Sequence, residues 1–212
     1  MSDQLIAYFG YGSLVNLQTL RTAYVGATPA RLKGWRRHWQ ARPGVAGGAQ
    51  TFSPALLSVH RAGPLNVHIE GMLIVDHLKH LGDLDEREAH YDRVLIGEDL
   101  IAPEDNSLLN SIPPDQRFVY VGRKTEAETS ALLQSYLDAV MAGFLHTFGE
   151  DGVTNFIHTT IGFDRHIIED RKEPIYPRSV KISDSEAIWF DKLLSEAGVK
   201  YAKRGQKITW RD

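Results

Sequence analysis

A glutamate stands on the face of a short predicted helix that should be buried. Leu81, Leu84 and Glu88 are spaced three and four residues apart, and this spacing places them on one side of a helix. Burial disfavours the charged form of a carboxyl group and raises its pKa, which suits a group that takes up and releases protons. Glu88 is therefore a candidate general acid or base. A structural alternative is that the helix ends there and the carboxylate meets solvent or an arginine such as Arg93.

A glycine loop is the second feature with chemical potential. Gly10-Tyr11-Gly12-Ser13 follows a short apolar run at residues 5–9, and backbone N–H groups in such a loop can converge on a carboxylate or a phosphate. An ordinary tight turn is the alternative. Val15 occupies the place of the third glycine of a dinucleotide-binding motif, and no Gly-Lys-Ser/Thr follows, so neither nucleotide-binding motif is present. The nucleophile elbow of serine hydrolases is also absent, because Ser13 has no glycine two positions away on either side.

Composition narrows the chemistry further. The chain has no cysteine, which excludes a thiol nucleophile, a disulfide framework and thiolate metal ligands. His77 and His80 are three residues apart, with His90 ten residues beyond, but they lack an HExxH pattern and convergent carboxylates, so we expect no metal and no cofactor. The net charge of −3 argues against a nucleic-acid partner. The basic run at residues 31–37, with its neighbouring tryptophans, is expected to be a solvated strand face.

The elements that would position these residues follow from hydrophobic periodicity and turn residues. The 212 residues predict one domain. No stretch resembles a signal peptide or a membrane span, which predicts a cytoplasmic protein without a membrane partner. Strands first and helices afterwards indicate an α+β fold, with helices packed on a mixed or antiparallel sheet curled toward a barrel. Strands are expected at residues 5–9, 30–40, 55–60, 67–75, 93–96 and 117–121, with 55–60 and 67–75 as antiparallel neighbours. Helices are expected at residues 16–24, begun by Asn16, at 76–89, begun by Asp76, and at 126–148, 152–160 and 184–197.

Three segments together resemble one known family. They are Tyr8-Phe9-Gly10-Tyr11-Gly12-Ser13-Leu14, then Glu70-Gly71-Met72-Leu73, then Leu84-Asp85-Glu86-Arg87-Glu88 with Tyr91 and Arg93. Their order and spacing resemble the gamma-glutamylcyclotransferase superfamily over residues 5–122. The resemblance implies a small mixed β-barrel with a cavity at the Tyr-Gly-Ser loop, here followed by a helical extension over residues 123–212. Ala89 departs from the glycine that often follows the catalytic glutamate in that family.

The resemblance also implies a reaction. A γ-glutamyl compound would be converted to 5-oxoproline and a free amine by attack of its own α-amine on its γ-carbonyl, without a cofactor. Glu88 would be the catalytic acid and base, and Tyr11, Gly12, Ser13 and Leu14 would hold the substrate α-carboxylate.

Further substrate contacts are expected from the polar loop at residues 164–179. Arg171, Tyr176 and Arg178 supply donors for an anionic substrate; a surface loop stiffened by Pro174 and Pro177 is the alternative. Two other functions stay open: a non-catalytic small-molecule-binding protein on the same fold, and a related γ-glutamyl acyl transfer. The sequence leaves the oligomeric state open, and it does not separate an amino acid, the ε-amine of lysine and the Cys-Gly of glutathione as the leaving amine.

Overall fold

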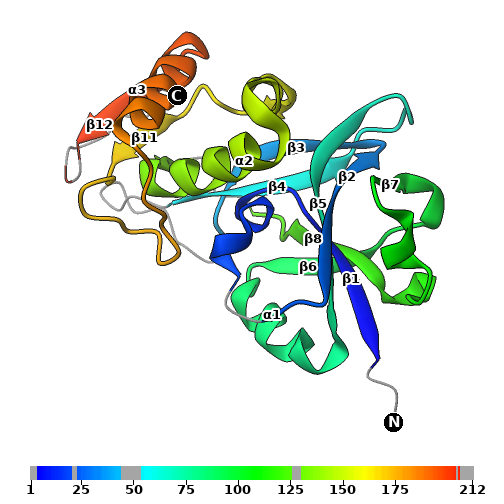
Figure 1. Ribbon diagram of the computed structural model, residues 1–212. Helices are drawn as coiled ribbons and strands as arrows, with labels where there is room; N and C mark the ends of the chain where they lie inside the picture. The colour runs from blue at the N-terminus through cyan, green and yellow to red at the C-terminus, as the bar shows by residue number, and fades with distance from the viewer. Residues whose placement is uncertain (1–3, 21–22, 44–53, 126–129, 204, 206–212) are drawn as a thin grey trace.

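The computed structural model describes residues 4–20, 23–43, 54–125, 130–203 and 205, and its main sheet has six strands (Figure 1). The strand order is β6-β8-β1-β5-β2-β7. The bounds are β1 (Leu5–Gly10), β2 (Gly26–Lys33), β5 (His68–His77), β6 (Tyr91–Leu95), β7 (Ile101–Pro103) and β8 (Arg117–Gly122). Strand β1 lies inside the sheet, antiparallel to β5 and parallel to β8. Its continuous apolar run is typical of a strand covered on both faces, and Ile6 through Phe9 are buried as expected.

The segment expected as one long strand at residues 30–40 is two strands in two different sheets. Gly34 has a φ of 74°, a value that glycine adopts without strain, and the chain turns there from β2 into β3 (Trp35–Ala41). Strand β3 pairs with β4 (Ala55–Arg61) and β10 (Thr160–Ile161). The expected pairing of 55–60 with 67–75 is therefore wrong, because β4 pairs with β3 while β5 pairs with β1 and β2.

The expected curling of the sheet into a barrel is also not observed. The described residues show an open six-stranded sheet and separate three-stranded sheets, with no closed barrel among them. Strand β4 lies near β8, but the hydrogen bond found between them runs through a side chain: the Gly122 N–H donates to Ser58 Oγ at 2.9 Å. A barrel requires continuous backbone pairing around its circumference, so the α+β assignment is confirmed and the barrel is not.

Three α-helices accompany the sheets: α1 (Leu81–Arg87), α2 (Gln134–Thr159) and α3 (Asp184–Glu196). Helix α3 begins where expected, at a capping box in which Ser183 and Glu186 exchange hydrogen bonds. The division expected between the helices at 126–148 and 152–160 is confirmed within the span of α2, because Gly149, with a φ of 69° and a ψ of −167°, is not helical and separates two helical segments. Helix α2 starts later than expected, because Leu132 and Leu133 form β9 of a small sheet with β11 (His166–Glu169) and β12 (Lys200–Lys203). Residues 126–129 of that prediction lie outside the described residues.

The two helices expected to begin at Asn16 and Asp76 do not begin at these residues. Asn16 begins only a 3-10 turn, η2 (Leu17–Thr19), which follows another, η1 (Ser13–Val15); residues 21–22 of the expected helix lie outside the described residues. Asp76 does not cap α1, because β5 runs on to His77 and a 3-10 turn, η3 (Leu78–His80), precedes the helix. Its buried carboxylate instead accepts hydrogen bonds from the His77 N–H and from His80 Nδ1.

A buried arginine joins α2 to the sheets. Arg37 is fully buried between the Phe144 and Phe156 rings. Its guanidinium donates to the Glu70 carbonyl at 2.7 Å and to the hydroxyls of Thr159 and Thr160 at 3.3 Å. Burial lowers the pKa of Arg37 to about 9. The expectation of a solvated basic face is thus wrong at this residue, although Arg31 and Arg36 are exposed.

A close contact fixes α2 over the glycine loop. Gly143 of α2 lies against Asn16, and a Cβ at this glycine would come within 2.6 Å of the Asn16 backbone nitrogen. The Asn16 side chain also donates to the Ala139 carbonyl at 3.0 Å. The glycine therefore lets α2 approach the 3-10 turns that follow the loop, and the first turns of the helix extend over the loop itself. None of the helices in the described part of the chain combines the length and the apolar character needed to span a bilayer.

Candidate functional site

Glu88 lies at the C-terminal end of α1 and is still largely buried. Its N–H bonds to the Leu84 carbonyl at 3.0 Å, and only 15% of its side chain is exposed. Its carboxylate pairs with the preceding residue, because Arg87 Nε donates to Glu88 Oε1 at 2.9 Å. The arginine suggested by the sequence, Arg93, pairs with Asp85 instead. Glu88 therefore combines features of both sequence interpretations: it ends the helix and has an ionic partner, yet it faces inward.

The surroundings of Glu88 act on its protonation in opposite directions. Burial raises the pKa of the Glu88 carboxyl, and the positive charges of Arg87 and Arg178 counteract that rise. The pKa stays above the ordinary value because loss of water is the larger effect. Arg87 is itself held in place by the Thr19 carbonyl at 3.0 Å and the Thr19 hydroxyl at 3.3 Å. Glu88 is thus a positioned carboxyl group whose proton is retained more strongly than that of an exposed glutamate.

Two adjoining cavities share Glu88 in their walls. An inner recess of about 30 Å³ and an outer cavity of about 180 Å³ share Ser13, Glu88, Tyr91 and Tyr136 in their walls. The rest of the recess is lined by Phe9, Tyr11, Gly12, Leu14, Leu57 and Tyr120. The rest of the outer cavity is lined by Arg42, Pro54, Ala55, Leu56, Arg87, His90, Leu133, Ile175, Tyr176, Pro177 and Arg178. Glu88 therefore stands where the glycine loop meets a larger, more basic space.

The predicted loop contributes backbone and side chains in different ways. The buried Tyr11 hydroxyl donates to the Tyr120 carbonyl at 2.7 Å, so this side chain anchors the loop. Leu14 packs into a buried apolar cluster beneath the recess. Ser13 lines both cavities, and hydrogen bonding from its backbone and side chain counters part of the rise in the pKa of Tyr136 that burial causes. Ser13 therefore offers a backbone N–H and a hydroxyl, two groups that can donate to a carboxylate.

Gly12 is required for close packing and not for an unusual φ. Its φ of −129° lies outside the left-handed region that favours glycine. A Cβ at this position would come within 2.8 Å of Tyr136 Oη and 3.1 Å of Leu57 Cδ2. A side chain here would therefore push on the wall of the recess, and the space itself excludes larger residues.

Three tyrosines surround the carboxyl group. Tyr91 Oη donates to the Leu57 carbonyl at 2.9 Å, and Tyr120 Oη donates to Asp85 Oδ1 at 2.6 Å. Burial raises the pKa of Tyr91, Tyr120 and Tyr136, and the Glu88 charge adds to the rise in each case. The three phenols therefore stay neutral hydrogen-bonding groups around Glu88.

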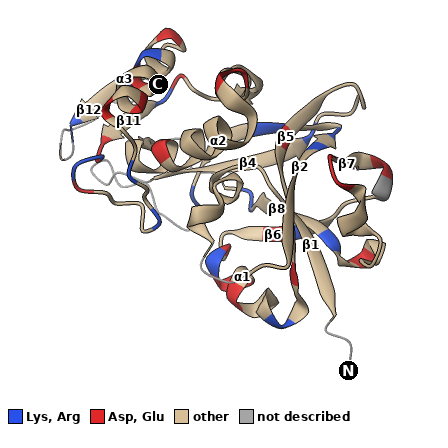
Figure 2. Ribbon diagram, viewed as in Figure 1, with Lys and Arg blue, Asp and Glu red and all other residues tan. Residues whose placement is uncertain are grey.

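Residues 170–178, the part of the expected polar loop that follows β11, have two roles: some fix the loop to α2 and others line the outer cavity. Asp170 accepts from the Ser135 N–H at 2.8 Å and from the Ile175 N–H at 2.9 Å, which ties the loop to the start of α2. Tyr176 and Arg178 line the outer cavity. Arg171 lines neither cavity, since its guanidinium is bound by the carboxylates of Asp138 and Asp191 at 2.7–2.9 Å. The structure thus brings Tyr176 and Arg178 together with Glu88 and places Arg171 in a clamp between α2 and α3. Basic residues occur both in this loop and in α1 (Figure 2).

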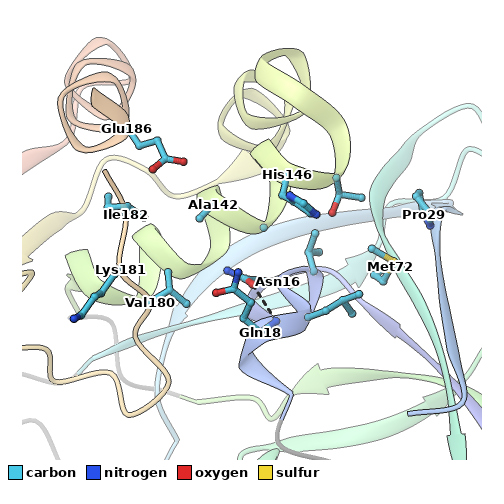
Figure 3. Close-up of a pocket in the computed structure, with 14 residues that line it drawn as sticks. Asn16, Gln18, Pro29, Met72, Ala142, His146, Val180, Lys181, Ile182 and Glu186 are labelled. Carbon is cyan, nitrogen blue, oxygen red and sulfur yellow. Dashed lines mark hydrogen bonds between the residues drawn. The ribbon is translucent and has the colours of Figure 1, made fainter. Parts of the chain in front are cut away.

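A third cavity, of about 450 Å³, lies about two helical turns further along α2, beside Ala142 and His146 (Figure 3). Two of its polar side chains, Asn16 and Glu186, are engaged within the protein. Asn16 Oδ1 accepts from the Gln18 N–H at 3.2 Å, and the Glu186 carboxylate accepts from the Ser183 N–H at 2.7 Å. It also lacks a buried carboxyl group with a raised pKa, the feature expected of an acid or base. The smaller space around Glu88 is therefore the candidate active site.

Comparison with protein-family models and with curated proteins finds no match to this chain. Solved structures do match it. A structure described as gamma-glutamyl cyclotransferase superposes with a TM-score of 0.51 at 13% identity, covering 89% of this chain and 99% of that chain. The protein has a gamma-glutamyl cyclotransferase-like fold. An uncharacterized protein from Homo sapiens matches at a TM-score of 0.49 and 14% identity, over 89% of this chain and 99% of that one. A glutathione-specific enzyme from yeast matches at 0.47 and 14% identity, over 92% and 96%.

The cyclotransferase-like fold holds no recognisable metal centre in its described part, where no group of three or more histidines and carboxylates converges. Two of the histidines considered from the sequence are close together, with the His77 and His80 rings 5.7 Å apart. His80 Nδ1 is bound to Asp76, and His90 lies in the outer cavity instead.

Sequence reasoning missed several residues of the candidate site. Tyr136 falls in the helix expected at 126–148 and Tyr120 in the strand expected at 117–121, and neither was given a role. His90 was considered only as a metal ligand, and Arg42 was not singled out. Tyr91 appeared in a motif without a role. A tyrosine hydroxyl on an otherwise apolar helix face is a usable signal, because a buried phenol needs a hydrogen-bond partner.

Proposed function

We propose that this protein is a γ-glutamyl cyclotransferase, releasing 5-oxoproline and a free amine from a γ-glutamyl compound. The observation that carries the proposal is the placement of Glu88: a largely buried carboxyl group with a raised pKa, at the junction of the glycine-loop recess and the outer cavity. A substrate that reaches across this junction has its two ends in chemically different spaces and its reacting atoms beside the carboxyl group.

In this proposal the glutamyl end binds at the glycine loop, with its α-carboxylate at the recess. The N–H and hydroxyl of Ser13, which lines both cavities, donate to that carboxylate. The flexible glutamyl chain then folds so that the α-nitrogen approaches the γ-carbonyl carbon. The nucleophile belongs to the substrate, so the protein has to supply orientation and proton transfer, the former being worth several orders of magnitude in rate.

Glu88 moves the protons in this scheme. Its carboxylate takes a proton from the α-ammonium group, and the α-amine attacks the γ-carbonyl carbon to form the new carbon–nitrogen bond. The proton then passes to the leaving nitrogen as the old carbon–nitrogen bond breaks. In total the α-nitrogen loses two protons to become the lactam N–H, while the leaving nitrogen gains two and departs as an ammonium group. A raised pKa suits this role because the same group must accept and return a proton.

The decisive experiment measures 5-oxoproline and free amine from a panel of γ-glutamyl amino acids, γ-glutamyl amines and glutathione. We expect turnover of at least one compound by the wild-type protein and a loss of at least about 10²-fold in Glu88→Gln, the low end for a positioned acid or base. Glu86→Gln makes the same chemical change on an exposed residue of α1 and should leave turnover unchanged. Near-normal turnover by a correctly folded Glu88→Gln protein would refute the assignment, and binding without any turnover would favour the non-catalytic alternative.

A further inference from the structure

The outer cavity carries more positive than negative charge. Its walls contain Arg42, Arg87 and Arg178, while Glu88 is its one carboxylate among the described lining residues. Arg87 is fully engaged, because its guanidinium donates to Glu88 and to the carbonyl and hydroxyl of Thr19. Partial burial and the nearby Arg42 lower the pKa of His90, so this histidine favours the neutral form. The charge available to a ligand is therefore that of Arg42 and Arg178.

Neither of these two arginines has an ion-pair partner within the described part of the chain. They come from segments far apart in sequence: Arg42 follows β3, and Arg178 ends the loop that carries Tyr176. Arg178 lies close enough to Glu88 to act on its charge, and Arg42 acts on Tyr91 and His90. Two arginines without an ion-pair partner in the walls of one cavity favour an anionic ligand there, because a guanidinium forms charge-assisted hydrogen bonds with a carboxylate.

The position of these arginines relative to Glu88 determines which part of a substrate they meet. The recess at the glycine loop and the outer cavity with Arg42 and Arg178 are distinct spaces that share Glu88 in their walls. In the proposed reaction Glu88 returns its proton to the leaving nitrogen, so the leaving group must extend from Glu88 away from the recess. Its substituents then lie in the space with the two arginines.

We propose that Arg42 and Arg178 bind a carboxylate on the leaving amine, so that the substrates are γ-glutamyl amino acids or γ-glutamyl peptides in preference to γ-glutamyl amines. This inference rests on the proposed function. An arginine guanidinium can bind a carboxylate through two parallel hydrogen bonds, which gives direction as well as strength. A γ-glutamyl amine offers no such group and leaves the two cations unpaired in its complex.

The test uses two substrates that differ only in this carboxylate, γ-glutamyl-alanine and γ-glutamyl-ethylamine. We expect the wild-type kcat/KM to favour γ-glutamyl-alanine by about 10- to 100-fold, the range for a hydrogen bond to a charged group. Arg178→Gln and Arg42→Gln should each lower this preference, and the double variant should nearly abolish it. The loss should appear in KM for γ-glutamyl-alanine, with values for γ-glutamyl-ethylamine little changed. Lys172→Gln removes an exposed charge from the same loop outside the cavity and should leave the preference intact.

Equal kcat/KM values for the two substrates in the wild type would overturn the inference. So would an equal loss for both substrates in Arg178→Gln and Arg42→Gln, because the arginines would then bind the glutamyl part that both compounds share. Binding is measured separately by calorimetry with the Glu88→Gln protein. If no compound is turned over, the proposed reaction is refuted. The carboxylate site is tested by itself through binding: the Glu88→Gln protein should bind γ-glutamyl-alanine more tightly than γ-glutamyl-ethylamine, and adding Arg42→Gln or Arg178→Gln should reduce that difference. Equal binding of the two compounds by the Glu88→Gln protein refutes the inference.

Discussion

Tyr176 meets Tyr136 edge to face, with ring centroids 4.9 Å apart and an angle of 87° between the ring planes. Tyr136 belongs to α2 and Tyr176 to the loop after β11, so both come from the part of the chain beyond the segments that carry the family resemblance. This pair forms one wall of the space around Glu88. The C-terminal third therefore completes the candidate site.

Replacing Tyr136 with phenylalanine tests the contact between this wall and the glycine loop. The variant keeps the ring and removes the hydroxyl that lies beside Gly12 and whose pKa responds to hydrogen bonding from Ser13. We expect a loss of about 0.5 to 1.5 kcal/mol in the free energy of unfolding, the net contribution of a typical hydrogen bond, together with weaker substrate binding. Denaturant unfolding and KM measure the two effects. Unchanged stability and KM would mean that the Ser13 contact contributes nothing.

The stability of Glu88→Gln should depend on pH in a defined direction. Burial raises the pKa of Glu88 in the folded protein, so the folded state disfavours the ionised carboxylate relative to the unfolded chain, where glutamate titrates near about 4.3. This penalty is absent below that pH and grows as pH rises from there to the folded pKa. We expect the melting temperature of Glu88→Gln relative to wild type to shift upward between pH 4 and pH 8.

Glu86→Gln is the control for this measurement, because Glu86 is an exposed carboxylate of the same helix. Its difference from the wild type should stay constant over the same pH range. A Glu88→Gln difference that falls as pH rises would show that the ion pair with Arg87 outweighs burial.

The glycine loop predicts unequal effects of two neighbouring substitutions. A Cβ on residue 12 would lie 2.8 Å from Tyr136 Oη and 3.1 Å from Leu57 Cδ2. Gly12→Val should therefore displace the wall of the recess and strongly raise the dissociation constant of a γ-glutamyl ligand. Ser13→Ala keeps the backbone N–H and removes one hydroxyl, worth about 0.5 to 1.5 kcal/mol or a twofold to twelvefold effect. Calorimetry with one ligand compares them. Normal binding by Gly12→Val with weak binding by Ser13→Ala would make the serine hydroxyl the main anchor.

Arg171 and Arg178 should separate stability from substrate binding. Arg171→Gln leaves the Asp138 carboxylate, only 4% exposed, and that of Asp191 without their counter-ion. We expect a loss of about 2 kcal/mol in the free energy of unfolding. This is less than the roughly 3 to 5 kcal/mol typical of fully buried pairs, because Arg171 is partly exposed. Arg178→Gln should cost far less, as this arginine has no ion pair within the described residues. Denaturant titration of both variants checks the order, and equal losses would contradict it.

Metal removal should leave activity unchanged. The described residues contain no cluster of three or more histidines and carboxylates, and the proposed reaction uses only a substrate amine and a protein carboxyl group. Activity measured before and after treatment with EDTA checks this expectation. Loss of activity that one added divalent ion restores would require a different mechanism.

Local sequence patterns determined the features that depend on neighbouring residues. The apolar run at residues 5–9 predicted the buried strand β1, and the helix expected at 184–197 begins at the same residue as α3. Helical periodicity by itself placed Glu88 on the inward face, because residues three and four apart share a helix face whatever lies around them. These inferences need no knowledge of distant segments.

Tertiary contacts decided the rest, because each joins residues far apart in the chain. Periodicity showed Tyr136 as one more apolar position, and only the docking of α2 on Asn16 places its hydroxyl at Ser13. Arg37 belongs to a basic run, yet Glu70 and the end of α2 supply the acceptors that allow its burial. Arg171 and Arg178 look equivalent in sequence. In the structure Arg171 is bound by Asp138 and Asp191, whereas Arg178 lines the outer cavity. The role of a charged side chain depends on the partners that the fold brings within reach.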